Sequence, residues 1–482
     1  MSIRHGVYIQ EEATAVQVPK TGNSSVQVVV GTAPVNMAEN PSVNVPILAN
    51  SGTEAMAALG YSVDFKNFTL CQTMFATSNL FQVSPVVYIN VLDPAKHNKE
   101  LAEAEYQVNQ KQAVIEKEGI ILEGLTVKNS TGDTELKAGE DYSAAFDSTT
   151  GFLTITMLAG GKGAAATAIK VSGKVIDPSK VTKEDVIGAV DPSTGAETGA
   201  QVIRQVYPRL GIVPGLILAP GWSQIPEVGL ALAAKAAKIN GVYSAMALLD
   251  LDTAKAKKYT DTKSVKEESG YTSPFCYPLW PCDRVGEYIL AKSAVAGAMI
   301  QYMASDNEDV PNQSPSNHLL GVGGQCLEDG TEVYLDQDQA NTVNGYGVTT
   351  AINQNGYRLW GNYTGAYPAS SDAKDIWFAV RRMFSWQGNN FIQTYFDEVD
   401  DPMNNVLVQS VVDSENIRCS AYAPKYWAGA SIEYKSDDNP KTAILAGTMK
   451  FRQHIAPYTP AQEIVDIIDY DTDTLAAAVG GN

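Results

Sequence analysis

The sequence predicts a multidomain protein of the α/β and α+β classes, with a mixed-sheet α/β body, an inserted antiparallel β domain and extended N- and C-terminal arms. Three observations support this fold: a strand–helix–strand unit at residues 215–250, a block of short strands at residues 105–199, and alternating apolar residues at both ends of the chain. The length of 482 residues suffices for roughly three domains, each with its own core.

The strand–helix–strand unit reads GLILAPGWSQIPEVGLALAAKAAKINGVYSAMALLD. Its two apolar runs flank an Ala-rich helix, which is the pattern of a βαβ crossover between parallel strands. In many α/β enzymes the first turn of such a unit binds phosphate. Here the turn contains Pro220, Gly221, Trp222 and Ser223, and it has neither the G-x-G-x-x-G nor the G-x-x-x-x-G-K-[ST] motif. The unit therefore favours a scaffold for assembly.

The composition, with 44% hydrophobic and 18% charged residues, is that of a folded protein. The formal net charge of −19 opposes direct binding to nucleic acid or anionic lipid, because both need clustered Lys and Arg. No apolar run approaches the roughly 20 residues of a membrane-spanning helix, and the first residues do not form a secretory signal. We therefore expect synthesis in a cytoplasm and no membrane insertion. The five scattered cysteines favour reduced, buried thiols.

Residues 1–20 are predicted to form the N-terminal arm. In this arm Ile3, Val7 and Ile9 would lie on one face of a strand. The first part of the α/β body follows at residues 21–104 and opens with VQVVVG, whose valines predict a strand that is covered on both sides. The other elements expected in this part are two helices and a buried strand, at residues 53–59, 70–81 and 84–94.

Residues 105–199 are predicted to form the inserted β domain. Short alternating runs such as FLTITM are separated by Gly- and Ser/Thr-containing turns, which is the pattern of antiparallel hairpins. The segment KQAVIEKEG near the start of this block fits either a helix or a strand.

The α/β body is predicted to continue through residues 200–355, where Asp283 is the expected N-cap of a helix. A C-terminal domain at residues 356–460 follows, with strands expected at residues 429–434 and 449–454. The chain ends in a C-terminal arm at residues 461–482, an acidic, strand-prone segment. The apolar positions of this arm are Ile464, Ile467 and Ile468.

The motifs that could support chemistry each fail at a required position. The four histidines are far apart, and no His/Cys pair has metal-ligand spacing. Ser223 misses the G-x-S-x-G elbow of a nucleophile and is predicted to be a turn or helix-cap serine. The aspartates of residues 469–473 have the spacing of a calcium loop, but Thr474 and Gly480 occupy positions that require Gly and Glu. We therefore expect no catalytic residue, cofactor or metal site.

Two adjacent arginines have the best claim to a specific role. Arg381 and Arg382 lie in the segment VRRMF. Arginine suits fixed, bidentate ion pairs, so these side chains are predicted to form salt bridges inside an assembly in preference to anion catalysis.

The chain resembles the contractile tail sheath proteins of bacteriophages and related injection systems over nearly its whole length, apart from the inserted domain. The landmarks that carry this resemblance occur in the family's order and are HGVYIQE, VVVGTAP, VVYINV, LILAPGWS, ALLD, YPLW, AVAGAM, YRLWG, VRRMF and PAQEI. Two positions depart from the family pattern. YRLWG continues into Asn362, Tyr363 and Thr364 in place of a basic residue and Thr, and the helix start before AVAGAM lacks Pro-Pro-Ser.

The resemblance implies a structural subunit and not an enzyme. Such a subunit stacks as hexameric rings in a helical sheath around a tail tube, and contracts from a metastable extended state to drive the tube through a cell envelope. The implied partners are other copies of the chain, the tail tube protein, the baseplate and the tail terminator. The implied location is a virion tail assembled in the host cytoplasm. The two arms would link subunits by adding strands to neighbouring sheets.

Three alternatives stay open from the sequence. The sheath could belong to a bacteriocin-like or defective-prophage particle. A lattice-forming surface protein would also polymerise, but it would need an export signal. An α/β enzyme would explain the βαβ unit, but it would need convergent acid, base or ligand groups.

Overall fold

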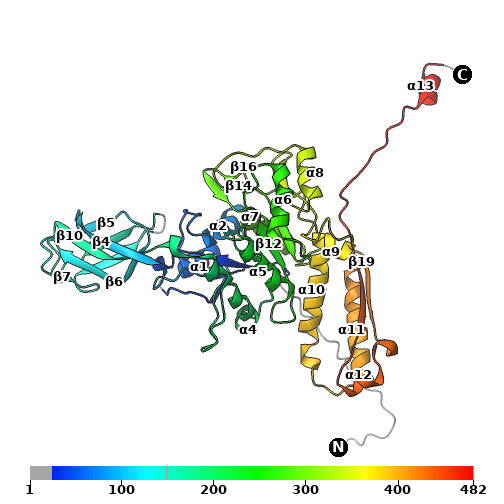
Figure 1. Ribbon diagram of the computed structural model, residues 1–482, viewed down its shortest axis with the longest axis horizontal. Helices are drawn as coiled ribbons and strands as arrows, with labels where there is room; N and C mark the ends of the chain where they lie inside the picture. Colours follow the sequence, from blue (N-terminus) through cyan, green and yellow to red (C-terminus); the bar gives the residue numbers. More distant parts are fainter. Residues whose placement is uncertain (1–23, 39, 148–149, 481–482) are drawn as a thin grey trace, which may run out of the picture.

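The computed structural model describes residues 24–38, 40–147 and 150–480. It contains mixed helices and several separate sheets, as the sequence predicts. Figure 1 shows an elongated molecule, with a β-rich part at one end, an α/β body in the middle and a helical C-terminal part at the other end. The predicted strand with Ile3, Val7 and Ile9 lies outside the described residues.

The body is built around a six-stranded mixed sheet. In spatial order its strands are β13 (Cys276–Leu279), β12 (Met246–Asp250), β11 (Leu216–Leu218), β1 (Gln27–Gly31), β3 (Val86–Asn90) and β2 (Pro46–Ala49). β1 pairs in parallel with β11 and β3, whereas β2 runs antiparallel to β3. The predicted βαβ unit is confirmed, because β11 and β12 are parallel neighbours joined by α5 (Pro226–Ala237).

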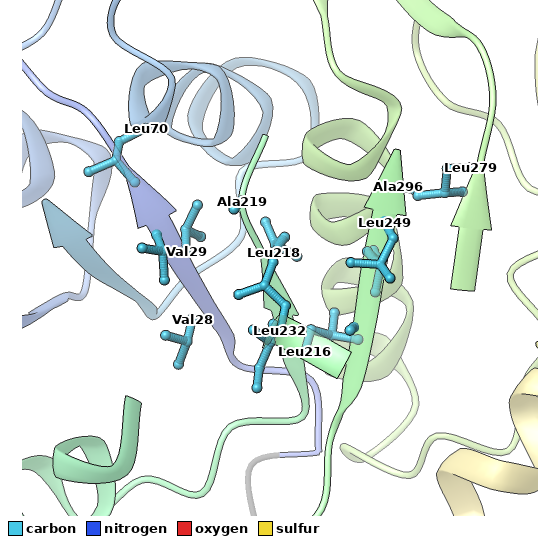
Figure 2. Close-up of a cluster of buried hydrophobic side chains, with 14 of the residues drawn as sticks. Val28, Val29, Leu70, Leu216, Leu218, Ala219, Leu232, Leu249, Leu279 and Ala296 are labelled. Carbon is cyan, nitrogen blue, oxygen red and sulfur yellow. The ribbon is translucent and has the colours of Figure 1, made fainter. Parts of the chain in front are cut away.

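Apolar side chains cover both faces of this sheet. Every residue of β1, β3 and β12 is buried, as expected for continuous apolar runs. Figure 2 shows Val28, Val29, Leu218 and Leu249 of the sheet in one cluster with Leu232 of α5 and with Ala296, which belongs to α7 (Lys292–Asp306). This cluster is the main core of the protein.

Further helices and small sheets surround the body. The helices are α1 (Gly52–Leu59), α2 (Leu70–Phe75), α3 (Lys183–Ile187), α4 (Val206–Leu210), α6 (Thr262–Ser269), α8 (Gln337–Gly345) and α9 (Ala373–Ile376). The small strands are β14 (Cys282–Val285), β15 (Tyr288–Leu290), β16 (Gly324–Cys326), β17 (Thr350–Asn353) and β18 (Tyr357–Trp360). The helices expected at residues 53–59 and 70–81 are confirmed, the second ending in a π-helical turn over Ala76–Leu80.

The β-rich part has two antiparallel sheets around a core of its own. The first contains, in spatial order, β4 (Asn98–Gln107), β10 (Ala168–Ile176), β6 (Ile120–Asn129) and β7 (Glu135–Leu136). The second contains β5 (Gln112–Ile115), β9 (Leu153–Met157) and β8 (Tyr142–Phe146). Val181 and Val186, which the predicted range 105–199 includes, pack instead into the main core of the body. The division of the chain into domains stays a prediction.

The C-terminal part contains two long helices that lie side by side, α10 (Phe378–Thr394) and α11 (Asn405–Tyr422). Neither helix was predicted from the sequence. A two-stranded ribbon of β19 (Trp427–Glu433) and β20 (Arg452–Pro457) packs on them, close to the two strands expected there. The short helix α12 (Lys441–Leu445) connects these strands. Met383, Trp386 and Trp427 belong to the core between helices and ribbon.

The prediction that Asp283 caps a helix is wrong. Asp283 lies in β14, and the helix begins nine residues later at Lys292, whose ammonium group forms an ion pair with the Asp283 carboxylate. Both side chains are fully buried. Burial raises the pKa of Asp283, and the charge of Lys292 opposes that rise. The ion pair of Asp283 and Lys292 therefore joins β14 to α7 inside the core.

We expect Lys292→Met to lower the free energy of unfolding by about 3–5 kcal/mol, because it leaves the Asp283 carboxylate buried without its partner. The double variant Asp283→Leu/Lys292→Met should regain most of this loss, since two apolar side chains remove both charges. Urea unfolding of the monomer measures both values. A double variant that is less stable than the single variant would contradict this account of the pair.

Candidate assembly surfaces

The carboxyl edge of the central sheet is where an α/β enzyme would bind its ligand. Directly beyond β1 this edge is filled by side chains. A Cβ atom added to Gly31 would lie 2.3 Å from Oγ1 of Thr69, and one added to Gly221 would lie 2.9 Å from Cγ2 of the same threonine. The close approach of backbone at these glycines therefore serves packing of the Thr69 segment against the sheet.

Ser223 lies in the turn after β11 and binds Asp250 at the end of β12. Its hydroxyl donates to Oδ2 of Asp250 at 3.0 Å and accepts from the Asp250 backbone N–H at 3.0 Å. The backbone N–H and hydroxyl of Ser293, at the start of α7, donate to the same carboxylate at 2.8 and 2.5 Å. Burial raises the pKa of Asp250, and these hydrogen bonds oppose that rise. Ser223 is thus a turn serine that joins two strand ends to a helix start.

A cavity of about 340 Å³ lies beside this network. Acidic, basic and apolar side chains line it, among them Asp64, Lys66, Tyr288 and Glu328. Within the part of the chain that the structure describes, no group of three or more His, Cys, Asp or Glu side chains is placed to hold a metal ion. Over the same residues, no helix has the length and apolar character needed to cross a bilayer.

The C-terminal arm leaves the body as an extended segment and ends in the short helix α13 (Thr472–Ala478), as Figure 1 shows. Residues 458–471 form no helix or strand within this chain. The apolar side chains of Ile464, Ile467 and Ile468 are 88%, 87% and 89% exposed. Apolar side chains gathered on an exposed segment indicate a surface that another molecule covers.

Two hydrogen bonds hold the start of this arm against the body. Oε1 of Gln462 accepts from Nδ2 of Asn362 at 3.2 Å, and Nε2 of Gln462 donates to the hydroxyl of Tyr363 at 3.0 Å. Tyr363 is itself stacked on Tyr367, with the ring centres 3.8 Å apart. The two residues that replace the family's basic position therefore contact the root of the arm. Sequence spacing gave no signal for this contact.

The ribbon β19–β20 presents a strand edge without a strand neighbour. Among the described residues, β19 and β20 pair only with each other. On the outer edge of β19, the side-chain amide of Asn416 bonds both backbone groups of Ile432 at 3.0 Å. Among the described residues no comparable side-chain contact with the backbone of β20 is found, so the outer edge of β20 is the more open of the two.

A buried polar network fixes this ribbon to the helices below it. Oε1 of Glu415, on α11, accepts from Gln453 of β20 at 2.9 Å and from Gln387 of α10 at 2.5 Å. The guanidinium of Arg418 and the hydroxyl of Tyr395 also donate to Glu415. Burial acts to raise the pKa of Glu415, but the hydrogen bonds and charge of Arg418, together with the bonds from Gln387 and Gln453, lower the pKa on balance. These bonds hold β20 at a fixed position against α10 and α11.

Arg381 and Arg382 both have partners within their own chain. Arg381 forms an ion pair with Asp375 at 3.3 Å and lies over the ring of Phe275, 5.0 Å from its centre. Arg382 is 5% exposed and donates to Ser24, close to the start of β1. Their predicted salt bridges between subunits stay a prediction, as do the arm contacts of Ile3, Val7, Ile9, Ile464, Ile467 and Ile468.

Comparisons with known proteins agree with the sequence and the fold. No family model matches the chain. The tail sheath protein of Burkholderia phage BcepMu is 26% identical over 99% of both chains, and that of Escherichia phage P2 is 24% identical over 59% of this chain and 69% of its own. The contracted helical sheath of the anti-feeding prophage has the same fold, with a TM-score of 0.57 and 14% identity over 97% of this chain and 99% of its own.

The relatives that these comparisons name are structural sheath proteins and not enzymes. The match to the protein of Burkholderia phage BcepMu covers nearly the whole of both chains, so it includes the α/β body, the inserted region and the C-terminal part. The chain is therefore similar over nearly its whole length to a phage tail sheath protein, and it has the fold of a contractile sheath subunit.

Proposed function

We propose that this chain polymerises into hexameric rings stacked helically around a tail tube, and that the polymer contracts from a metastable extended state. One observation carries this proposal. The same chain has a strand edge on β20 that no described strand pairs with, and a C-terminal arm whose apolar side chains are exposed. Because the arm points away from the body, it does not cover the edge of β20 in its own chain. Repeated from copy to copy, this contact is heterologous and builds an open helical polymer.

The arms of neighbouring subunits would extend the β19–β20 ribbon by strand addition. Residues 458–471, fully extended at about 3.3 Å per residue, span roughly 45 Å. An isolated two-stranded ribbon is marginally stable, and further strands stabilise it. The outer edge of β20 is the first site we assign to a neighbour's arm, because Asn416 occupies part of the edge of β19.

Each arm contact should be marginal by itself. An added strand gains about four backbone hydrogen bonds at roughly 0.5–1.5 kcal/mol each, and it buries isoleucines at roughly 1.5–3 kcal/mol for each fully buried side chain. Fixing eight to ten residues costs about 1–2 kcal/mol per residue. The gain and the cost are of the same size, so the contact becomes firm only when the lattice repeats it.

The proposed partners are other copies of the chain, a tail tube protein, a baseplate and a tail terminator. Support for the baseplate comes from a solved structure of the anti-feeding prophage baseplate, which contains a chain with the same fold at a TM-score of 0.56. The proposed place of action is the tail of a phage or of a related contractile particle. Contraction would repack subunits between two arrangements and would need no nucleotide.

Deleting residues 460–482, or residues 1–18, should leave a folded monomer that no longer forms cylinders. Ile464, Ile467 and Ile468 of the C-terminal arm are 87–89% exposed, so their loss should change the free energy of unfolding by less than about 0.5 kcal/mol. Thermal melting reports the fold, and sedimentation with negative-stain microscopy reports the polymer. Truncated chains that still build full-length cylinders would refute arm exchange.

A single charge in the arm should have the same effect as truncation. We expect Ile468→Asp to raise the protein concentration needed for assembly at least tenfold, because the charge would have to be buried on the added strand. Val242→Asp is the matched control, since Val242 is also exposed, at 56%, but lies in a loop of the body. Equal effects of the two substitutions on the light-scattering threshold would count against the arm.

The β-rich part should be removable without loss of assembly, as an insert on the outer surface. Asn98 and Ile176 are partners in the pair β4–β10, so they can be joined by a short Gly/Ser linker in place of residues 99–175, which keeps Ile176 in the core of the body. Removing residues 105–199 instead should give insoluble protein, because Val181 and Val186 belong to the core of the body. If the shorter excision folds but never forms cylinders, the insert carries lattice contacts.

A further inference from the structure

The first residues that the structure describes are held by two charged side chains from distant parts of the chain. The carboxylate of Asp309 accepts from the backbone N–H of Ser24 at 2.9 Å and from its hydroxyl at 2.7 Å. The guanidinium of Arg382 donates to the carbonyl oxygen of Ser24 at 3.0 Å and to the hydroxyl of Ser25 at 2.6 Å. Both backbone groups of Ser24 are therefore bound by side chains.

The two side chains come from different layers of the protein. Asp309 follows the end of α7, which packs on the central sheet, and Arg382 lies on α10 of the C-terminal part. Arg382 is 5% exposed and also lies over the ring of Phe378, 5.6 Å from its centre. Ser24 thus connects the body to the C-terminal helices directly before β1 begins.

The backbone at this site is strained. Asp309 has a φ of +58° and its neighbour Glu308 has a φ of +55°, in the left-handed region that residues other than glycine rarely adopt. Such strain persists only where the surrounding contacts require it. Here the turn that it forms places the Asp309 carboxylate against Ser24. Bonds to charged groups are also stronger than neutral hydrogen bonds.

We propose that Asp309 and Arg382 form a clamp that fixes Ser24 in front of β1 and transfers a pull on Ser24 to α7 and α10. Without the clamp, the same pull would act on β1, the central strand of the main sheet, and would open its pairing from one end. This inference rests on the proposed function, in which residues 1–18 link one subunit to the next. In this proposal Asp309 and Arg382 position Ser24 within their own chain and do not act on a neighbouring subunit.

The clamp differs from the salt bridges between subunits that the sequence predicts. Salt bridges in the lattice would involve Arg381 and Arg382 alike. Of the two arginines only Arg382 belongs to the clamp, because Arg381 pairs with Asp375 and does not contact Ser24. Arg381→Met is therefore the matched control for Arg382→Met, on the same helix and with the same change of side chain.

The first measurement uses the full-length chain at a concentration where it is monomeric. Hydrogen–deuterium exchange of a peptide that spans Ser24 should be about tenfold faster in Asp309→Ala than in the unchanged chain, because the acceptor of the Ser24 N–H is lost. It should also be faster in Arg382→Met, because the Ser24 carbonyl and the Ser25 hydroxyl lose their donor and the segment opens more often. Arg381→Met should leave this exchange unchanged. Equal exchange in all of the chains would overturn the clamp. If Arg382→Met does not fold, Ser24→Ala, which removes the bonds of the hydroxyl to Asp309 and Ser25 and keeps the backbone, gives the same comparison.

The second measurement uses assembled cylinders. Cylinders of Arg382→Met should dissociate at a lower urea concentration than those of Arg381→Met, by more than the difference between the urea midpoints of the two monomers. Equal weakening of both kinds of cylinder, without faster exchange at Ser24, would overturn the clamp in favour of lattice salt bridges. If the unchanged chain forms no cylinders, the proposed function fails, and the exchange measurement alone then decides whether the clamp exists.

Discussion

The free strand edge of β20 is the constraint on which the rest of this structure depends. On the side away from β19, no other strand among the described residues pairs with β20. The same chain exposes Ile464, Ile467 and Ile468 on a segment that forms no strand of its own. In the proposed function a second copy of the chain buries these side chains and pairs with this edge, so the polymer completes what one subunit leaves open.

The remaining features hold that edge and its arms at fixed places. The carboxylate of Glu415 joins the ribbon to α10 and α11 through five hydrogen bonds from four side chains. Gln462 holds the root of the C-terminal arm against Asn362 and Tyr363. The central sheet, with Asp250 and the pair of Asp283 and Lys292 buried beside it, provides the rigid body from which these parts extend. A polymer that changes its packing without unfolding needs subunits of this kind.

The sequence predicted those parts of the fold in which one local pattern decides the structure. The apolar runs around Val28 and Leu248 are strands, and the Ala-rich run between β11 and β12 is a helix, because burial and periodicity agree there. Asp283 was misjudged because its buried partner, Lys292, belongs to the helix that the aspartate was expected to cap. The contacts of Arg382 with Ser24 join residues 358 positions apart, and no local pattern reports such a pairing.

The most direct test of this account is disulfide trapping between subunits in assembled cylinders. A cysteine placed on the edge strand by His454→Cys would be combined in turn with Ile464→Cys, Ile467→Cys or Ile468→Cys in the arm, and the five native cysteines, none of them disulfide-bonded, serve as the background. The account predicts that at least one combination gives chains covalently linked into multimers in cylinders and unlinked monomers in dilute solution. Cylinders that form normally and give no link between subunits at any of these pairs would contradict it.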